Sequence, residues 1–286
     1  MMTLMNLGYL RLMRVDKPVG FWLLLWPTLW ALWVASAGRV SLKLFIIFTL
    51  GVFIMRSAGC VINDIWDRNF DGHVERTANR PLAKKEVTLK GAIILLCFLL
   101  CIALVLVCFL NFLCFELACV SLFITLIYPL MKRWIVAPQC VLGIAFSLGI
   151  PMAFAAVQGD LSHFSWLLWL LGILWPVIYD TLYAMVDRKD DLKLGLHSTA
   201  IWFGQWDKSV IAMLEVIWLV LWGIFAYQNH LSFIFYLGLA GVGILLFYEY
   251  MLIRNREPKV CFKAFLNHAW IGSILWISLA LAYKIN

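Results

Sequence analysis

The chain has 286 residues, of which 64% are hydrophobic and 14% are charged, and its mean hydropathy is +0.91. These values lie outside the range of water-soluble globular domains, so a lipid bilayer is the expected solvent. The net charge of +7 is explained by lysine and arginine in loops on one side of a membrane and by attraction to anionic lipid, and it does not indicate nucleic-acid binding.

Nine apolar runs are long enough to cross a bilayer, which takes about 20 residues of helix. In chain order they are 19–37, 43–63, 90–109, 112–130, 136–157, 164–186, 209–228, 231–253 and 267–283. Very short turns follow the third and the seventh run, so each of these helices forms an antiparallel hairpin with the next. The sequence therefore predicts an all-α polytopic membrane protein with nine transmembrane helices, in which residues 1–286 form a single transmembrane domain.

Lysine and arginine residues predict the orientation of these helices. With the N-terminus inside, 19 of the 23 basic residues fall in inner segments, and only Arg39, Lys43 and Lys284 fall outside. The excess of positive charge in inner loops thus predicts a cytoplasmic N-terminus and, because the number of spans is odd, a C-terminus on the opposite side. All long polar loops then face the cytoplasm, where we expect the functional site.

Seven of the ten aspartates lie in two windows, one after the second run and one at the end of the sixth. They are Asp64, Asp67 and Asp71 in the first window, and Asp180, Asp187, Asp190 and Asp191 in the second. Helical spacing places the first three on one face, and it does the same for Asp180, Asp187 and Asp191. Like charges beside hydrocarbon need a neutralising cation. Carboxylate oxygens are the ligands that Mg²⁺ prefers, and Mg²⁺ is usually shared with substrate phosphates.

Basic side chains near the two windows are suited to hold a diphosphate, because guanidinium and ammonium groups bind phosphate oxygens. The candidates are Arg56, Arg68, Arg76, Arg80, Lys132, Arg133, Arg188 and Lys193. The general excess of basic residues in inner loops is the alternative explanation. It fails for Arg56, which lies within an apolar run.

The two windows resemble those of the UbiA superfamily of intramembrane prenyltransferases. The first window reads Asn63-Asp64-Ile65-Trp66-Asp67-Arg68-Asn69-Phe70-Asp71, which is similar to the family pattern N-D-x-x-D-x-x-x-D. The second contains Tyr179-Asp180-Thr181 and then Asp187-Arg188-Lys189-Asp190-Asp191. The resemblance covers nearly the whole chain and implies a UbiA-type bundle with a cytoplasmic-side active site. Residues 14–20, 56–60, 128–133 and 195–200 are most similar to members that prenylate 4-hydroxybenzoate in ubiquinone biosynthesis.

The resemblance also implies the reaction and the residues that perform it. A polyprenyl chain would pass from polyprenyl diphosphate to the ring carbon ortho to the hydroxyl of 4-hydroxybenzoate. The implied Mg²⁺ ligands are Asn63, Asp64, Asp67, Asp71, Asp180, Asp187 and Asp191, and the six aspartates among them are the expected catalytic residues. The implied substrate-binding residues are Arg14, Lys17, Arg56, Arg68, Arg76, Lys132, Arg133, Tyr128, Tyr183, Arg188, Lys193 and His197.

Several points stay open in the sequence. The sequence does not assign each basic residue to the diphosphate or to the acceptor carboxylate. The proton lost from the acceptor ring could pass to a carboxylate of the aspartate windows or to the diphosphate. The family usually has lysine at the position of His197, so a cationic contact there would depend on pH, or Lys193 would supply it.

Two other functions are compatible with parts of the sequence. A prenyltransferase of the same superfamily that acts in the menaquinone, tocopherol or haem O pathway would share the diphosphate motifs. A membrane transporter would place charged groups near the membrane midplane, whereas the aspartates here gather at one rim, which favours an enzyme. The expected partners are the two substrates and membrane lipid, without an obligate protein partner, and the expected location is a bacterial inner membrane.

Overall fold

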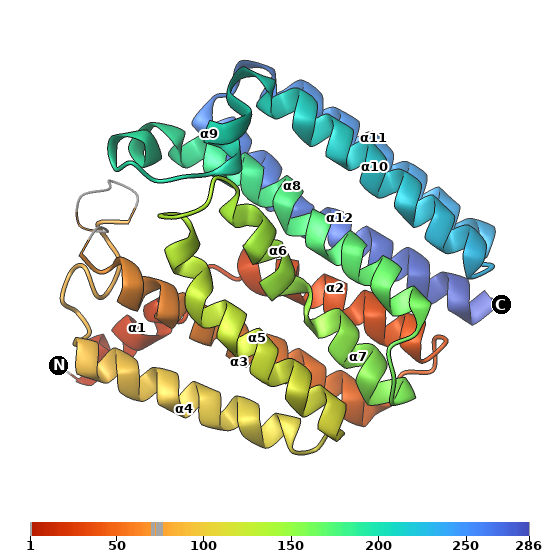
Figure 1. Ribbon diagram of the computed structural model, residues 1–286, viewed down its shortest axis with the longest axis horizontal. Helices are drawn as coiled ribbons and strands as arrows, with labels where there is room; N and C mark the ends of the chain where they lie inside the picture. Colours follow the sequence, from red (N-terminus) through yellow and green to blue (C-terminus); the bar gives the residue numbers. More distant parts are fainter. Residues whose placement is uncertain (1, 70–71, 73–76, 286) are drawn as a thin grey trace.

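The computed structural model describes residues 2–69, 72 and 77–285, with only the backbone for residues 2–6. This part of the chain is helical (Figure 1). The helices are α1 (Met2–Leu12), α2 (Val19–Ala35), α3 (Leu42–Asp67), α4 (Leu89–Val107), α5 (Phe112–Met131), α6 (Pro138–Ser147), α7 (Gly149–Gln158), α8 (His163–Lys193), α9 (Thr199–Phe203), α10 (Asp207–Gln228), α11 (Phe233–Leu252) and α12 (Pro258–Ile285). Single 3₁₀ turns, η2 (Gly204–Trp206) and η3 (Ile253–Asn255), precede α10 and follow α11.

The expectation of a nine-span membrane bundle is confirmed. Within the described ranges, eight helical segments are long and apolar enough to cross a membrane, and the shorter apolar helix α2 is the ninth. The outer surface is correspondingly apolar: Leu42, Phe112 and Trp270 are each more than 70% exposed. A water-soluble protein would not display so many large apolar side chains, and lipid is the solvent that accepts them.

Polar residues between the apolar runs define where the helices begin. The side chains of Ser41, Thr88 and Asn111 accept hydrogen bonds from the backbone amides three residues ahead and so cap α3, α4 and α5. The α4–α5 turn contains only residues 108–111, which makes these two helices the expected antiparallel hairpin.

Several elements differ from the apolar-run prediction, among them α8, which continues to Lys193 rather than to residue 186, and α9, which no apolar run predicts. The predicted span 136–157 is two helices, α6 and α7, which meet at Leu148. Pro151 has no amide hydrogen to donate to the carbonyl of Ser147, and this accounts for the break. The last helix begins at Pro258 rather than near residue 267. Lys259 and Lys263 lower the hydropathy of its first turns, so the apolar run begins later than the helix does. Residues 2–12, for which we predicted no element, form α1.

The main core surrounds α8, which packs against α6, α10 and α12. Four fully buried tryptophans, Trp30, Trp175, Trp218 and Trp222, are in mutual ring contact there. This packing fixes the direction of α8 relative to its neighbours. The C-terminal end of α3, which carries Asp64 and Asp67, lies at the same end of the bundle as the C-terminal end of α8, which carries the second window (Figure 1).

Candidate active site

The first aspartate window is held by three arginines from different segments. Asp64 is fully buried, and its Oδ1 accepts a hydrogen bond from Nη2 of Arg14 at 3.0 Å and lies 3.3 Å from Nη1 of Arg80. Asp67 lies 3.6 Å from Nη2 of Arg133 and 4.0 Å from Nη1 of Arg80. The second oxygen of Asp64, Oδ2, is buried without a hydrogen-bond partner. The Asp64 carboxylate therefore has one oxygen that is free to accept a further contact, close to the guanidinium groups of Arg14 and Arg80.

The short helix α1 delivers Arg14 to this window. Leu12 is fully buried against α3 and α4, and Arg11 pairs with Glu86 at 2.6 Å, so α1 is fixed at both of these points. Arg14 follows in the left-handed backbone region at φ 58°, which non-glycine residues rarely adopt. The tight turn directs its guanidinium group back to Asp64.

The second window lies on α8, as predicted. Asp180, Asp187 and Asp191 belong to one uninterrupted helix that continues to Lys193. Nε2 of Gln139, on α6, donates to Oδ2 of Asp180 at 3.3 Å, and Oε1 of the same amide accepts from the backbone amide of Thr199 at 3.0 Å. Gln139 thereby fixes Asp180 and the start of α9 together.

Tyr128 connects the two windows. It lies near the end of α5 and interacts electrostatically with Asp67 from the first window and with Asp180 from the second. Arg56 acts on Tyr128 and on Asp180 as well, and Lys132 also acts on Asp180. Tyr128 is therefore within electrostatic range of carboxylates from both windows, and Arg56 and Lys132 are within range of Asp180.

An apolar cavity of about 230 Å³ lies beside Arg56. Its wall is formed by side chains of α2 to α7, and Arg56 is its single charged lining residue among those described. The Arg56 guanidinium group lies 5.8 Å from the centre of the Phe146 ring. A Cβ atom on Gly20 would overlap that guanidinium group, so α2 approaches Arg56 as closely as glycine allows. Arg56 therefore stands where the cavity meets the charged site.

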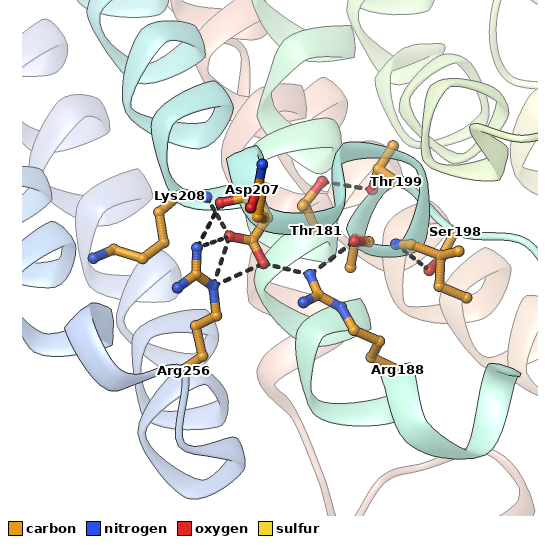
Figure 2. A network of polar contacts seen from close by, with 10 residues as sticks. Thr181, Arg188, Ser198, Thr199, Asp207, Lys208 and Arg256 are labelled. Atoms are coloured by element: carbon orange, nitrogen blue, oxygen red, sulfur yellow. Dashed lines mark hydrogen bonds and ion pairs between the residues drawn. The ribbon is translucent and has the colours of Figure 1, made fainter.

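A buried ion network holds the C-terminal half of α8 in place. Figure 2 shows Asp207 between the guanidinium groups of Arg188 and Arg256. Asp207 is fully buried, Nε of Arg256 donates to it at 2.9 Å, and Nη2 of Arg188 pairs with it while also donating to the carbonyl of Ala200 at 2.7 Å. Thr181 and Thr199 share a further hydrogen bond of 2.7 Å. These contacts join α8 to α9, to α10 and to the short segment between η3 and α12.

The remaining predicted residues lie around the same rim. Asn63 is half-buried beside Asp64, whereas Lys17 is exposed. Arg68 donates to the carbonyl of its neighbour Ile65 at 2.7 Å.

On the α8 side, Lys193 is 75% exposed and pairs with Asp190 at 3.1 Å. The backbone amide of His197 donates to the carbonyl of Lys132 at 2.8 Å, which fixes the loop after α8 to the end of α5. The ring of Tyr183 packs on Phe265 at 4.9 Å between centroids.

Two predicted residues, Asp71 and Arg76, lie outside the described residues. Asp64 and Asp67 both lie on α3, three residues apart, as the expected shared helical face requires.

Sequence reasoning missed Gln139 and Asp207. A polar amide inside the apolar run 136–157 was the available signal for Gln139, because polar groups at membrane depth usually have a partner. Asp207 is an isolated aspartate in the sequence. Its two arginine partners are 19 and 49 residues away along the chain, so only the folded structure reveals the network.

Comparison with known proteins gives one consistent result. Residues 24–274 match the UbiA prenyltransferase family. A 4-hydroxybenzoate octaprenyltransferase of Escherichia fergusonii is 50% identical over 277 residues, which are 97% of this chain and 96% of that protein. The protein of the same description from Coxiella burnetii is 48% identical over 276 residues, which are 96% of both chains.

Solved structures are similar in fold. A UbiA homolog from Aeropyrum pernix K1 has a TM-score of 0.81 at 23% identity and covers 93% of this chain and 98% of its own. A UbiA homolog from Archaeoglobus fulgidus bound to GPP and Mg²⁺ has a TM-score of 0.77 at 20% identity and covers 98% of this chain and 100% of its own.

Proposed function

Because the chain belongs to the UbiA prenyltransferase family, we propose that it is an integral membrane enzyme that transfers a polyprenyl chain from polyprenyl diphosphate to 4-hydroxybenzoate in ubiquinone biosynthesis. The expected product carries the chain on the ring carbon ortho to the hydroxyl. Relatives that share about half of their residues with this chain over nearly its full length act with an octaprenyl chain according to their names, and octaprenyl diphosphate is the donor we expect.

The position of Arg56 is the observation that carries this proposal. Arg56 lines the apolar cavity and also acts on Asp180 and Tyr128. A polyprenyl diphosphate has an apolar chain joined to a strongly anionic head, and the site has the same two parts side by side. The cavity would hold the first isoprene units and exclude water from the reacting carbon.

The donors of the two windows fit Mg²⁺. Their ligand atoms are all oxygens, and Oδ2 of Asp64 is a buried acceptor without a hydrogen-bond partner. In our proposal the ligands are Asn63, Asp64, Asp67, Asp180, Asp187 and Asp191, with Asp71 beyond the described residues. Bound Mg²⁺ supplies charge neutralisation on the diphosphate as it leaves.

The chain's own residues would bind and orient the substrates. Arg14, Arg80 and Arg133 supply guanidinium groups beside the first window, where a diphosphate oxygen can take the place of a carboxylate partner. The ring of Tyr128 is within electrostatic range of both windows, and its electron-rich face can stabilise positive charge on the allylic carbon. Arg56 is able to hold either the diphosphate or the acceptor carboxylate.

Transfer can be tested with the purified protein in lipid nanodiscs. We expect labelled octaprenyl diphosphate to be joined to 4-hydroxybenzoate when Mg²⁺ is present, with little transfer to a dihydroxynaphthoate or a porphyrin. EDTA should stop the reaction, and added Mg²⁺ should restore it. Transfer that is insensitive to EDTA would refute the metal assignment, and faster transfer to another acceptor would refute the acceptor assignment.

A further inference from the structure

A second group of ionisable side chains lies away from the aspartate windows, in the C-terminal part of the bundle. Glu215 on α10, Glu249 on α11 and His268 on α12 each offer a ligand atom, and these atoms lie within 4.8 Å of one another. The three residues are 6%, 1% and 0% exposed. Glu215 is eight residues beyond Asp207, so the group lies about 12 Å inside the end of α10, within the apolar bundle.

Three polar atoms of this group have no hydrogen-bond partner in the described part of the chain. Both oxygens of Glu249 and Nε2 of His268 are buried without hydrogen-bond partners. The amide of Asn267 is close to Glu249 but outside hydrogen-bonding geometry. Among the described residues, no lysine or arginine is close enough to act on Glu215, Glu249 or His268. Two carboxyl groups in an apolar interior therefore need neutralisation from another source.

The ligand set and its geometry indicate a cation. Nδ1 of His268 lies 3.4 Å from Oε2 of Glu249, so the imidazole and this carboxylate lie side by side. Nδ1 also lies 3.1 Å from the carbonyl of Ala264. A metal-binding histidine usually donates one ring N–H to such a carbonyl, and here the unpartnered Nε2 would remain free to bind.

We propose that Glu215, Glu249 and His268 form a second metal site, which takes a divalent transition-metal ion such as Zn²⁺ and joins α10, α11 and α12. An imidazole with two carboxylates suits Zn²⁺ better than Mg²⁺, whereas the aspartate windows offer only oxygen ligands. The site adjoins α8 as well, because the ring of His268 lies 5.0 Å from that of Trp175 and 6.0 Å from that of Tyr179, between centroids. Its expected role is to stabilise the C-terminal helices.

Metal binding can be measured without substrate, so the result does not depend on the proposed reaction. Metal-free full-length protein in nanodiscs would be equilibrated with Zn²⁺ in a large excess of Mg²⁺, which occupies oxygen-only sites, and bound zinc counted by mass spectrometry. We expect about one zinc ion per chain and a higher Tm when zinc is bound. Co²⁺ in place of Zn²⁺ should give the visible absorption bands of a nitrogen- and oxygen-ligated ion, without the near-ultraviolet band of cysteine ligation.

Variants assign the metal to these residues. Glu249→Gln, Glu215→Gln and His268→Gln should each lower zinc occupancy at least tenfold at the same free zinc concentration and remove the rise in Tm. Glu116→Gln, which removes an exposed carboxylate of α5, and Asp64→Asn, in the first window, should retain the ion. If one of the three glutamine variants does not fold, the other two still test the assignment. No zinc in the wild type, or equal zinc in the wild type and the three variants, would overturn the proposal and leave protons as the neutralising partner.

Discussion

At the scale of single residues, the contact between Gly20 and Arg56 gives a test of the arginine's role. A methyl group at position 20 would overlap the guanidinium group, which is the movable end of a flexible side chain. Gly20→Ala should therefore displace Arg56 with little loss of stability, while kcat/KM for the prenyl diphosphate falls on the order of tenfold. Gly223→Ala is the matched control, because a Cβ atom there meets no other atom within 4 Å. Equal kinetics in both variants would argue against a substrate contact by Arg56.

Asp64 is the residue whose loss we expect to be most severe. Asp64→Asn keeps the size of the side chain but removes a metal ligand and leaves Arg14 and Arg80 without their shared carboxylate. We predict that kcat falls by roughly a hundredfold or more in single-turnover assays at saturating Mg²⁺, while the protein remains inserted in the membrane. Asp160→Asn, in an exposed turn, should behave like the wild type. Near-normal turnover of Asp64→Asn would remove this residue from the site.

The sequence alone predicts the residues whose chemistry is out of place in a membrane. Asp64, Asp180 and Arg56 are charged groups in or beside apolar runs, and such groups need a functional or structural reason. It does not predict which arginine meets which carboxylate, because Arg14 and Asp64 are 50 residues apart and meet only after α1 has folded onto α3.

At the scale of helices, the Asp207 network makes a prediction about stability. Asp207→Asn would leave Arg188 and Arg256 without their buried carboxylate, and we expect a loss of roughly 2–4 kcal/mol in the free energy of unfolding. Thermal unfolding in detergent and protease cleavage between residues 194 and 206 would measure it. The control is Asp190→Asn, which breaks an exposed pair with Lys193 and should change stability by less than about 1 kcal/mol. Similar Tm values for the two variants would contradict a stabilising role of the network.

Apolar runs predict that a helix crosses the membrane, but they do not predict interruptions within it. The α6–α7 break follows from Pro151 and from the close approach of α2, because a Cβ atom on Gly149 would lie 2.6 Å from Oγ1 of Thr28. Neither a proline nor a glycine changes the mean hydropathy of a long apolar run enough to show this. The opposite effect applies to the first turns of α12, where two lysines lower the hydropathy although the helix continues into the bundle.

At the scale of the whole molecule, the orientation in the membrane is a prediction from charge. The ion pairs of Arg14, Arg80, Arg133, Arg188 and Arg256 all lie at the end of the bundle that carries the aspartate windows. The distribution of lysine and arginine predicts that this end faces the cytoplasm. A reporter that is active only in the periplasm should therefore give signal when fused after Asn286 and none when fused after Arg80. The opposite pattern would show that the bundle is inverted.

The size of the apolar cavity limits how the enzyme can choose its donor. Its volume of about 230 Å³ is below the roughly 300–1,000 Å³ of pockets that enclose a drug-sized molecule, and an octaprenyl chain is larger than such molecules. If octaprenyl diphosphate is the donor, as we propose, most of its chain extends beyond the cavity into the surrounding lipid, where additional isoprene units meet the same environment whether or not the enzyme is present. The protein then contacts only the first isoprene units and the diphosphate of the donor. The tail length of the quinone would be decided by the synthase that makes the donor, and this transferase would accept whatever length the membrane supplies.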